Sequence, residues 1–445
     1  MLTSQENEFF TQVSRGTPMG EYLRRHWHPI APVAELHERP TRPVRLLGED
    51  LVLYCDRSGT YGLIDRLCAH RRVDLTYGIP EDHGLRCMYH GWMYDETGQC
   101  IEQPFEETVH PSRVSPPGSE PGSSDAVVKL GGFKEKVRVA AYPVEAKAGL
   151  LWAYLGPAPV PLVPDWAPFG WEGAYADICI TELPCNWFQA QENSIDPVHV
   201  EWLHAYWAQR LSVDTIFGKP PTHLKIATDP FEHGMVYRRL VEGASEDDEN
   251  WTKGRVCLFP YALFIGHDYA CHFEWRVPID DGHTLSVMWF VNRVAPGAES
   301  PDQDRIPYWY GTLYDDDGRL RTSHVVNQDI VAWTSQGRVN DRTKETLGES
   351  DRGVIMMRRL LKNEVALVAE GQDPKCVFRD PASNHDVYLP VHDFFGKIAV
   401  GPSAHNTTHI PFQHGEPQEA IDAINAVTAS WAAIPRPDTS ATAPA

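Results

Sequence analysis

The chain has 445 residues, of which 42% are hydrophobic and 23% are charged, and its formal net charge is −21. This length exceeds one ordinary hydrophobic core, so we expect two or three compact units. The negative charge disfavours nucleic acid as a partner, and an anionic substrate would need local arginines. No apolar run approaches the ~18 residues that span a bilayer, which argues against a membrane protein.

The first twenty residues do not combine a basic segment with an apolar one, so they do not resemble a secretory signal and we expect a cytoplasmic protein. Nine cysteines are too few for a disulfide scaffold in a chain of this length. We therefore expect reduced thiols, some of them available as metal ligands.

Residues 1–40 are predicted to form a helical lead-in, because apolar residues recur at helical spacing between residues 5 and 28. Short alternating segments predict a small all-β domain over residues 41–155. Within it, residues 110–125 are rich in proline, glycine and serine, and we expect them to form a mobile surface loop.

Five prolines within residues 155–168 mark the predicted end of this domain. Residues 156–434 then mix strands with helices and are predicted to form a second domain. The tail at 435–445 lacks core-forming residues and is predicted to be disordered.

Inside the second domain, two alternating segments at 271–279 and 284–292 are separated by a short turn and predict a β-hairpin. Helical patterns follow at 324–338 and 351–370, the second opening on an aspartate and ending near a glycine. The predicted fold class is therefore α+β, with an antiparallel sheet in the second domain.

Two Cys/His pairs stand out in the first domain, Cys68-x-His70 and Cys87-x-x-His90. Two thiols and two imidazoles suit either a tetrahedral zinc site or an iron–sulfur cluster with mixed ligands. Each half supplies one Cys and one His, which favours a [2Fe–2S] cluster with both cysteines on one iron and both histidines on the other. A zinc-stabilised module, which would be colourless, is the alternative.

A second candidate metal site lies in the second domain, where Asp196 precedes His199 and His204. Two histidines and a carboxylate can hold a mononuclear Fe(II) with open positions for O2 and substrate. On an ideal α-helix the two histidines would point about 140° apart, so a helix break or a π-bulge is needed to bring them together. Asp196-Pro197 is predicted to cap this helix. Taken alone, the pair could equally be two core histidines.

In this order the two motifs resemble those of the oxygenase component of the Rieske non-haem iron ring-hydroxylating oxygenases. The family patterns Cys-x-His to Cys-x2-His and Asp-x2-His-x4-His match at 68–90 and 196–204. The segments TPMGEYLRRHWHP and SDRGVIMMRRLL further resemble the phthalate dioxygenase and aromatic O-demethylase branch. The resemblance covers nearly the whole chain and implies an all-β Rieske domain followed by a helix-grip-like catalytic domain.

The resemblance also implies roles for single residues. Asp329, in a late helix with Gln336 seven residues on, would be the third iron ligand, whereas Asp341 and Asp351 are expected to be solvated or capping residues. Asp196 would bridge a cluster-ligating histidine of a neighbouring subunit to an iron-ligating histidine and carry electrons between them. This bridge implies a homotrimer or a multiple of trimers.

The activity that the resemblance implies is oxidation of an aromatic acid with O2. Electrons would come from NAD(P)H through a separate reductase, with or without a ferredoxin, since the chain has neither a GxGxxG fingerprint nor a P-loop. We expect O-demethylation of a methoxylated, lignin-derived aromatic acid with release of formaldehyde. The alternatives are cis-dihydroxylation of a phthalate-like acid and a non-catalytic Rieske electron carrier.

Two sequence features bear on the substrate. The phthalate branch tends to have glycines where this chain has Asn193 and Ser194, which is a departure from that pattern. Strand alternation puts Tyr237 and Arg239 on one face and Arg238 on the other. Arg239 could hold a carboxylate or could belong to a solvated strand face, and the pattern does not decide between them.

Overall fold

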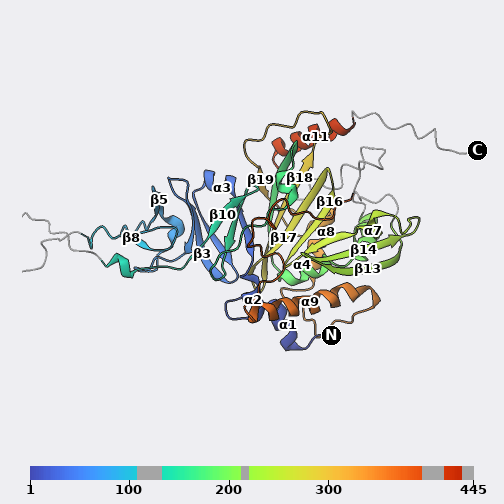
Figure 1. The fold of residues 1–445 in the computed structure, drawn as a ribbon, viewed down its shortest axis with the longest axis horizontal. Coiled ribbons are helices and arrows are strands. Elements are labelled where there is room, and N and C mark those ends of the chain that lie inside the picture. The colour runs from blue at the N-terminus through green and yellow to red at the C-terminus, as the bar shows by residue number, and fades with distance from the viewer. Residues whose placement is uncertain (108–132, 212–219, 393–414, 433–445) are drawn as a thin grey trace, which may run out of the picture.

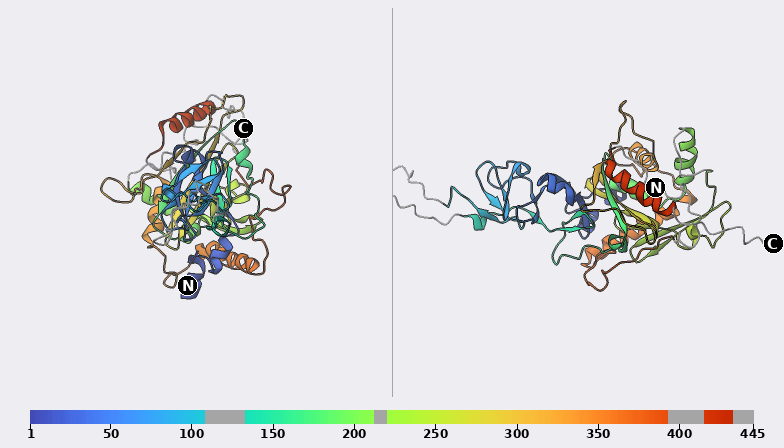
Figure 2. Two further views of the ribbon diagram at one scale, coloured as in Figure 1. Left: turned by 90° about the vertical axis from the view of Figure 1, so that its left-hand side faces the viewer. Right: turned by 90° about the horizontal axis from the view of Figure 1, so that it is seen from above.

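The computed structural model describes residues 1–107, 133–211, 220–392 and 415–432. Two β-rich parts lie end to end, one coloured blue to teal on the left of Figure 1 and the C-terminal part on the right, and the N-terminus of the chain lies below the right-hand part. The view from above in Figure 2 shows the same arrangement. The predicted loop at 110–125 and the predicted tail at 435–445 lie outside the described residues.

Two short helices open the chain, α1 (Ser4–Thr11) and α2 (Pro18–Leu23), as the spacing predicts. The prediction of a helical segment through residue 28 is wrong at its end, because Trp27–Pro32 forms a strand, β1. Its two prolines cannot donate the hydrogen bonds of a helix interior. All six residues are buried, and the strand pairs with β11 (Leu150–Tyr154).

Three small antiparallel sheets hold the cluster motif and its surroundings, in the strand orders β1-β11-β10, β2-β3-β4-β9 and β5-β6-β7-β8. The β-rich character predicted from alternation is therefore confirmed. Their other elements are β2 (Thr41–Leu46), β3 (Glu49–Cys55), β4 (Tyr61–Asp65), β5 (Ile79–Glu81), β6 (Gly84–Arg86), β7 (Met93–Tyr94), β8 (Cys100–Glu102), β9 (Ala141–Tyr142), β10 (Val144–Lys147), α3 (Val33–Glu38), η1 (Leu75–Tyr77) and η2 (Lys134–Lys136).

A large eight-stranded sheet forms the C-terminal part, in the order β13-β14-β15-β16-β17-β18-β12-β19. Its neighbouring strands are antiparallel except for the parallel pair β12 and β19, which confirms the predicted antiparallel sheet. The strands are β12 (Ala174–Leu183), β13 (His223–Phe231), β14 (Gly234–Val241), β15 (Arg255–Leu258), β16 (Ala262–His267), β17 (Ala270–Asp280), β18 (His283–Arg293) and β19 (Tyr308–Tyr310).

The predicted hairpin is confirmed as β17 and β18, whose tight turn is held by Asp280, which accepts the Gly282 N–H at 2.9 Å. The same hairpin joins the two parts of the molecule, because the Leu47 and Gly48 N–H groups donate to the carbonyls of Pro278 and Ile279 at 3.0 and 2.8 Å. The division of the chain at residue 156 stays a prediction.

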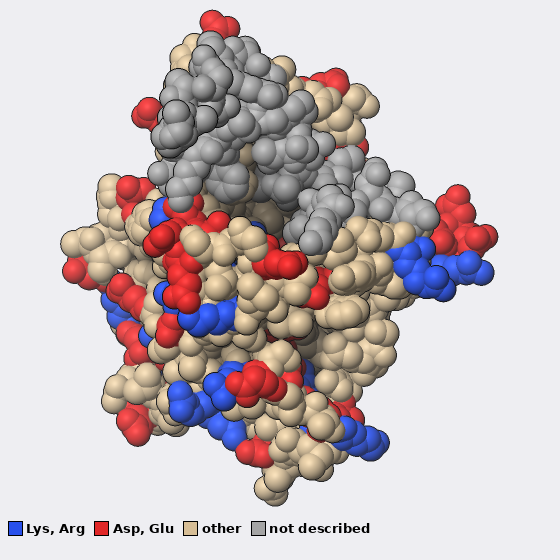
Figure 3. All heavy atoms as spheres, turned by 90° about the vertical axis from the view of Figure 1, so that its right-hand side faces the viewer, with Lys and Arg blue, Asp and Glu red and all other residues tan. Residues whose placement is uncertain are grey.

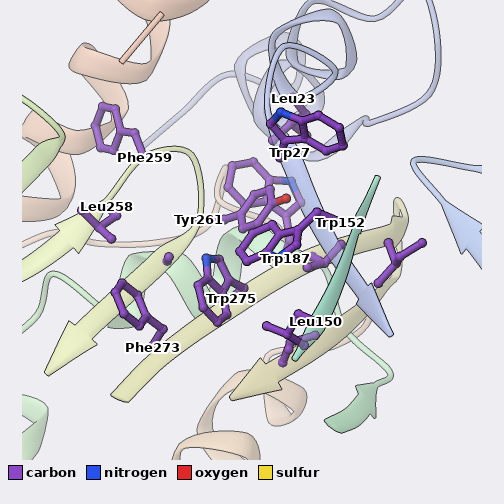
Figure 4. Packing of buried hydrophobic residues seen from close by; sticks show 14 of the residues in the cluster. Leu23, Trp27, Leu150, Trp152, Trp187, Leu258, Phe259, Tyr261, Phe273 and Trp275 are labelled. Atoms are coloured by element: carbon purple, nitrogen blue, oxygen red, sulfur yellow. The ribbon is translucent and has the colours of Figure 1, made fainter. Parts of the chain in front are cut away.

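The two faces of β17 have opposite chemistry. Phe273 and Trp275 belong to the main hydrophobic core, where Trp275 meets Trp152 of β11 edge-on at a centroid distance of 5.3 Å (Figure 4). His272, Glu274 and Arg276 point the other way, as alternation along a strand requires, and are also buried. This polar face lines a cavity.

The helices predicted at 324–338 and 351–370 are confirmed as α8 (Val325–Ser335) and α9 (Arg352–Ala369). Another helix, α4 (Trp187–Asn193), is tied to α9 by the buried ion pair of Glu192 with Arg358 at 2.6 Å, and Glu192 also pairs at 2.6 Å with Arg342, which lies between α8 and α9. The remaining elements are α5 (His199–Glu201), η4 (Trp202–Trp207), α6 (Ala208–Arg210), α7 (Glu249–Thr252), α11 (Gln418–Ala432), η3 (Ala167–Gly170) and η5 (Glu349–Asp351). Among the described helices, none has both the length and the apolarity needed to cross a bilayer.

Candidate metal sites and substrate cavity

Cys68 and Cys87 lie in two similar loops, one after β4 and the other between β6 and β7. Both thiols are buried, whereas His90 is exposed and His70 is partly exposed. In each loop, the backbone N–H groups two and three residues after the cysteine donate to its sulfur. Such donors stabilise a thiolate, which is the form that binds metal.

The four side chains converge as a mixed-ligand cluster requires. The Cys87 thiol, together with Tyr94 and the backbone donors, lowers the pKa of Cys68 to about 5. The rings of His70 and His90 lie 4.5 Å apart between centroids. His70 stacks on Trp92, and its buried Nδ1 has no hydrogen-bond partner in the described structure, so it is free to bind a metal.

The second site depends on a change of helix type after His199. The α-helical turn α5 continues directly into η4, a π-helix, which confirms the predicted break. Because a π-helix closes its hydrogen bonds between residues five apart, it brings His199 and His204 to the same side. Their ring centroids are 5.1 Å apart.

Asp329 completes a three-residue group from the neighbouring helix α8. Its Oδ1 lies 3.6 Å from His199 Nε2 and 3.3 Å from His204 Nε2, and one ligand atom of each residue lies within 4.8 Å of the others. Burial alone would lower the pKa of His204, but the Asp329 carboxylate and Gln328 raise it above its ordinary value. The group attracts a cation and offers the ligand set of a 2-His-1-carboxylate iron site.

Two further side chains, Gln328 and Asn193, hydrogen-bond to this group, and a third, Asp196, lies at ion-pair distance from it. Asp196 Oδ2 lies 3.6 Å from His199 Nδ1, Gln328 Oε1 lies 3.0 Å from His204 Nδ1, and Asn193 donates to Asp329 Oδ1 at 3.2 Å. Asp196 and Gln328 approach the histidine nitrogens that face away from the metal position, and Asn193 donates to the Asp329 oxygen that faces the histidines. Contacts of this kind fix the tautomer and orientation of metal ligands.

Asp196 accepts the Val198 N–H at 2.8 Å, but the predicted cap position is two residues early, because α5 begins at His199 with Val198 as its N-cap residue. Burial would raise the pKa of Asp196, but His199 and the backbone N–H groups of this turn keep it below the ordinary value. The lowered pKa keeps the carboxylate ionised, and the Asp196 side chain is 30% exposed.

Other predicted carboxylates lie elsewhere. Asp341 accepts the Thr343 N–H at the surface, and Asp351 precedes α9 as its N-terminal cap residue, which confirms their predicted solvated and capping positions. Gln336 ends α8 in an exposed position and bonds to Asn340, so it does not join the candidate iron group.

A cavity of about 290 Å³ lies between the sheet and helices α4, α5 and α8, with the candidate iron group in its wall. This volume is near the lower limit of the roughly 300–1,000 Å³ typical of small-molecule sites. Much of its lining is apolar and comes from Leu263, Ile265, Met288, Phe290 and Val326.

Two arginines enter the same cavity from the sheet. Tyr237 and Arg239 share a face as predicted, and Arg255 is the direct cross-strand neighbour of Tyr237. The Nη1 of Arg239 and the Nε of Arg255 are buried without a hydrogen-bond partner among the described residues. The solvated-face alternative is therefore wrong for Arg239. It holds for Arg238, which pairs with Asp229 at the surface.

The two guanidinium groups together form a positively charged site that favours the binding of an anion. Burial and the charge of Arg255 lower the pKa of Arg239 to about 10, which still leaves it a cation at neutral pH. Burying a cation without an opposite charge is costly. An anionic ligand that neutralised both groups would remove this cost and gain charge-assisted hydrogen bonds.

Comparison with known proteins agrees with this architecture. Residues 26–113 match the Rieske [2Fe-2S] domain family. The chain is 48% identical, over 95% of its length and 96% of the relative, to the 5,5'-dehydrodivanillate O-demethylase oxygenase subunit of Sphingobium sp. (strain NBRC 103272 / SYK-6). It is 30% identical to the phthalate 4,5-dioxygenase oxygenase subunit of Pseudomonas putida, over 84% and 88%.

Solved structures share the fold at lower identity. The terminal oxygenase of carbazole 1,9a-dioxygenase from Novosphingobium sp. KA1 aligns with a TM-score of 0.53 and 20% identity, over 80% of this chain and 97% of that one. NdmA of Pseudomonas putida CBB5 with caffeine aligns with a TM-score of 0.53 and 21% identity, over 79% and 93%.

The fold, the Cys/His loops and the His/His/Asp group together define an iron-dependent oxygenase with two metal centres. The chain belongs to the Rieske non-haem iron oxygenases. Members of this family carry a Rieske [2Fe-2S] cluster and a mononuclear iron and receive electrons from a separate reductase. The zinc module and the non-catalytic carrier are therefore set aside.

Removing one histidine of the candidate iron group tests the assignment of the two sites. In His204→Ala, the mononuclear iron should be lost because its ligand set falls from three to two, while the distant cluster remains. Iron content should drop from about three to about two per chain, with unchanged acid-labile sulfide. His283→Ala, at the β17–β18 turn, is the matched control and should keep all of its iron; equal iron in the two variants would contradict the assignment.

Proposed function

We propose that this chain is the terminal oxygenase that O-demethylates a methoxylated aromatic acid, using O2 and electrons supplied by a reductase. The observation that carries this proposal is the 48% identity, over nearly the whole of both chains, with the oxygenase subunit of an O-demethylase. The paired arginines in the cavity support an acid as the substrate.

Each metal centre has its own set of residues in this proposal. Cys68, His70, Cys87 and His90 would hold the [2Fe–2S] cluster, and His199, His204 and Asp329 would hold the mononuclear iron. The iron, when bound, supplies reductive activation of O2 next to the substrate. Overall, one O2, two electrons and two protons convert the methyl ether into a phenol, formaldehyde and water.

The protein's own residues prepare the cavity for this reaction. Arg239 and Arg255 bind the carboxylate and thereby orient the ring, while the apolar wall formed by Met288, Phe290 and their neighbours excludes water. Gln328 fixes His204, and Asn193 fixes Asp329, so that the ligand set is held before a metal binds. The substrate methyl group then lies on the side of the ring that faces the His/His/Asp group.

We further propose that the subunits assemble head to tail into a homotrimer or a multiple of trimers. This arrangement would deliver electrons from the cluster of one subunit to the mononuclear iron of the next. In Figure 1, the strands β5 to β8 that flank the cluster loops lie at the far left, whereas α4 and α8 lie in the right half. A second subunit would bring its cluster to Asp196, which is exposed beside His199. The exposed stacked pair of Trp202 and Tyr206 lies one turn further along the same helix.

The electron donor is proposed to be an NAD(P)H-dependent reductase, with or without a ferredoxin. One solved structure that shares the fold is a complex of the carbazole 1,9a-dioxygenase oxygenase with ferredoxin. None of the nine cysteines is joined in a disulfide, which fits the reducing conditions of the cytoplasm, where we propose that the enzyme works.

A second reaction, cis-dihydroxylation, has support of its own. Two relatives named as dioxygenases, of phthalate and of 3-chlorobenzoate, are 30% and 34% identical to this chain. The same cavity would need only a different ring pose. The lower identity places this reaction second.

Product analysis separates the two reactions. The reconstituted holoenzyme with a generic reductase and NADH should release one formaldehyde per methoxybenzoate consumed and leave the ring aromatic. The measurement is formaldehyde by derivatisation and the aromatic product by mass spectrometry. A cis-diol product with no formaldehyde would replace the first proposal with the second.

The arginine pair predicts a charge-specific loss of activity. Arg239→Met removes one charged hydrogen-bond donor to the carboxylate, which is worth ~1.5–3 kcal/mol and lowers kcat/KM by roughly 10- to 150-fold. Turnover of a neutral methoxybenzene should change much less. Arg238→Met is the matched control on the opposite strand face, and an equal loss in both variants would refute the carboxylate role.

The bridging role of Asp196 predicts slow electron transfer with intact metal centres. In Asp196→Asn, the reduced cluster should reoxidise roughly 10- to 100-fold more slowly when O2 and substrate are added, because the carboxylate that orients His199 is lost. Stopped-flow absorbance of the cluster gives the rate. The exposed Asp341→Asn should behave as the native enzyme, and an unchanged rate in Asp196→Asn would rule out the bridge.

A further inference from the structure

His272, Glu274 and Arg276 form a buried row on the cavity face of β17. Their exposed fractions are 8%, 7% and 2%, although charged residues are rarely buried this deeply unless they are paired. All three line the cavity that holds the candidate iron group. The mechanism described above uses none of them.

The row is internally paired except at one atom. Glu274 Oε1 accepts from His272 Nε2 at 2.9 Å, and Glu274 Oε2 accepts from Arg276 Nη2 at 2.5 Å. Arg276 also donates to the Glu274 carbonyl at 2.7 Å, and its guanidinium lies over Trp333. Burial would raise the pKa of Glu274, but Arg276 and His272 keep it below its ordinary value, so the carboxylate is ionised.

This pairing places a proton on one nitrogen of the His272 ring. Since the Glu274 carboxylate can only accept, Nε2 carries the proton, and in the neutral ring Nδ1 presents a lone pair. The Nδ1 atom is buried and has no hydrogen-bond partner among the described residues. A buried acceptor without a donor is unfavourable, so the site is complete only when a ligand or a water supplies an O–H or N–H.

We propose that His272 is a specificity-determining residue, whose Nδ1 accepts a hydrogen bond from a phenolic hydroxyl of the substrate. The inference rests on the proposed function and deepens it, because it selects methoxylated acids that also carry a free hydroxyl. A carboxylate cannot donate to Nδ1 and is bound by Arg239 and Arg255 instead. A methoxy oxygen has no proton, so a methyl ether placed against Nδ1 would leave the nitrogen unpaired.

The cavity wall supports a ring hydroxyl as the donor. Phe290, the cross-strand neighbour of His272, lies 5.4 Å from its ring between centroids, and Met288 is the cross-strand neighbour of Glu274. Both side chains present apolar surface against which an aromatic ring packs. The substrate would therefore be held at two points, the carboxylate by the arginines and the hydroxyl by His272, with the methoxy group left free to face the iron.

Equilibrium binding to the oxidised holoenzyme, measured by calorimetry without a reductase, tests this inference independently of turnover. The two probes are 4-hydroxy-3-methoxybenzoate and 3,4-dimethoxybenzoate, which differ only by a methyl group on the oxygen in question. The native enzyme should bind the hydroxylated acid at least ~10-fold more tightly, because a site built for a hydroxyl rejects an analogue that lacks it.

Two variants separate recognition from packing. His272→Phe removes the acceptor and should bring the ratio of the two Kd values close to one, whereas His272→Gln, whose amide oxygen can accept, should keep part of the preference. Iron and sulfide contents of each variant verify that the metal centres are intact. If His272→Phe does not fold, a native enzyme without the preference still overturns the proposal.

The outcomes distinguish this inference from the proposed function. Equal binding of the two acids by the native enzyme, or a preference that survives in His272→Phe, overturns the role of His272 and leaves acid O-demethylation standing. If neither acid binds and no methoxybenzoate yields formaldehyde, the proposed function fails and takes this inference with it.

Discussion

The catalytic centre depends on one local constraint, the π-helical turn at Trp202–Trp207. In an uninterrupted α-helix, His199 and His204 would diverge by about 140°, and Asp329 could approach only one of them. The π-helix is rare because its hydrogen bonds are less favourable, and it is found mostly at functional sites. Here its cost is offset by contacts from α8, since Gln328 and Asp329 reach the two rings only in this geometry. The contacts within the candidate iron group therefore stabilise the π-helical turn that brings its residues together.

The cavity contains two kinds of buried charge, and the difference between them is informative. The row on β17 is compensated, because Glu274 lies between His272 and Arg276 and pairs with both. Arg239 and Arg255 are uncompensated within the described chain. Buried charges that are paired add little net stability but fix geometry. Unpaired cations destabilise the empty site and make the binding of an anion more favourable. The row on β17 therefore positions the His272 side chain, whereas the two arginines bind an anionic group of the ligand.

The sequence predicted those parts of the sites in which the functional residues are close together along the chain. The Cys/His pairs, the two histidines with Asp196, and the strand face of Arg239 all follow from local spacing. Arg255, His272 and Asn193 reach the cavity through sheet pairing or helix packing, which short patterns do not encode, although Gln328 could have been noticed beside Asp329. Strand β1 was missed for a related reason, because its pairing with β11 spans more than 100 residues of sequence. Asp329 followed only from resemblance to the family.

The net charge of −21 and an acidic substrate are compatible because they act over different distances. Acidic and basic side chains are intermixed on the face of the C-terminal part seen in Figure 3. At physiological salt, surface charges are screened over about 8 Å, so they slow the approach of an anion more than they weaken its binding. Inside the cavity, apolar walls reduce screening, and Arg239 and Arg255 act at full strength. Raising the salt concentration should therefore speed association of the anionic substrate but leave its equilibrium affinity nearly unchanged, because Arg239 and Arg255 set that affinity. An exposed arginine patch could not produce this combination.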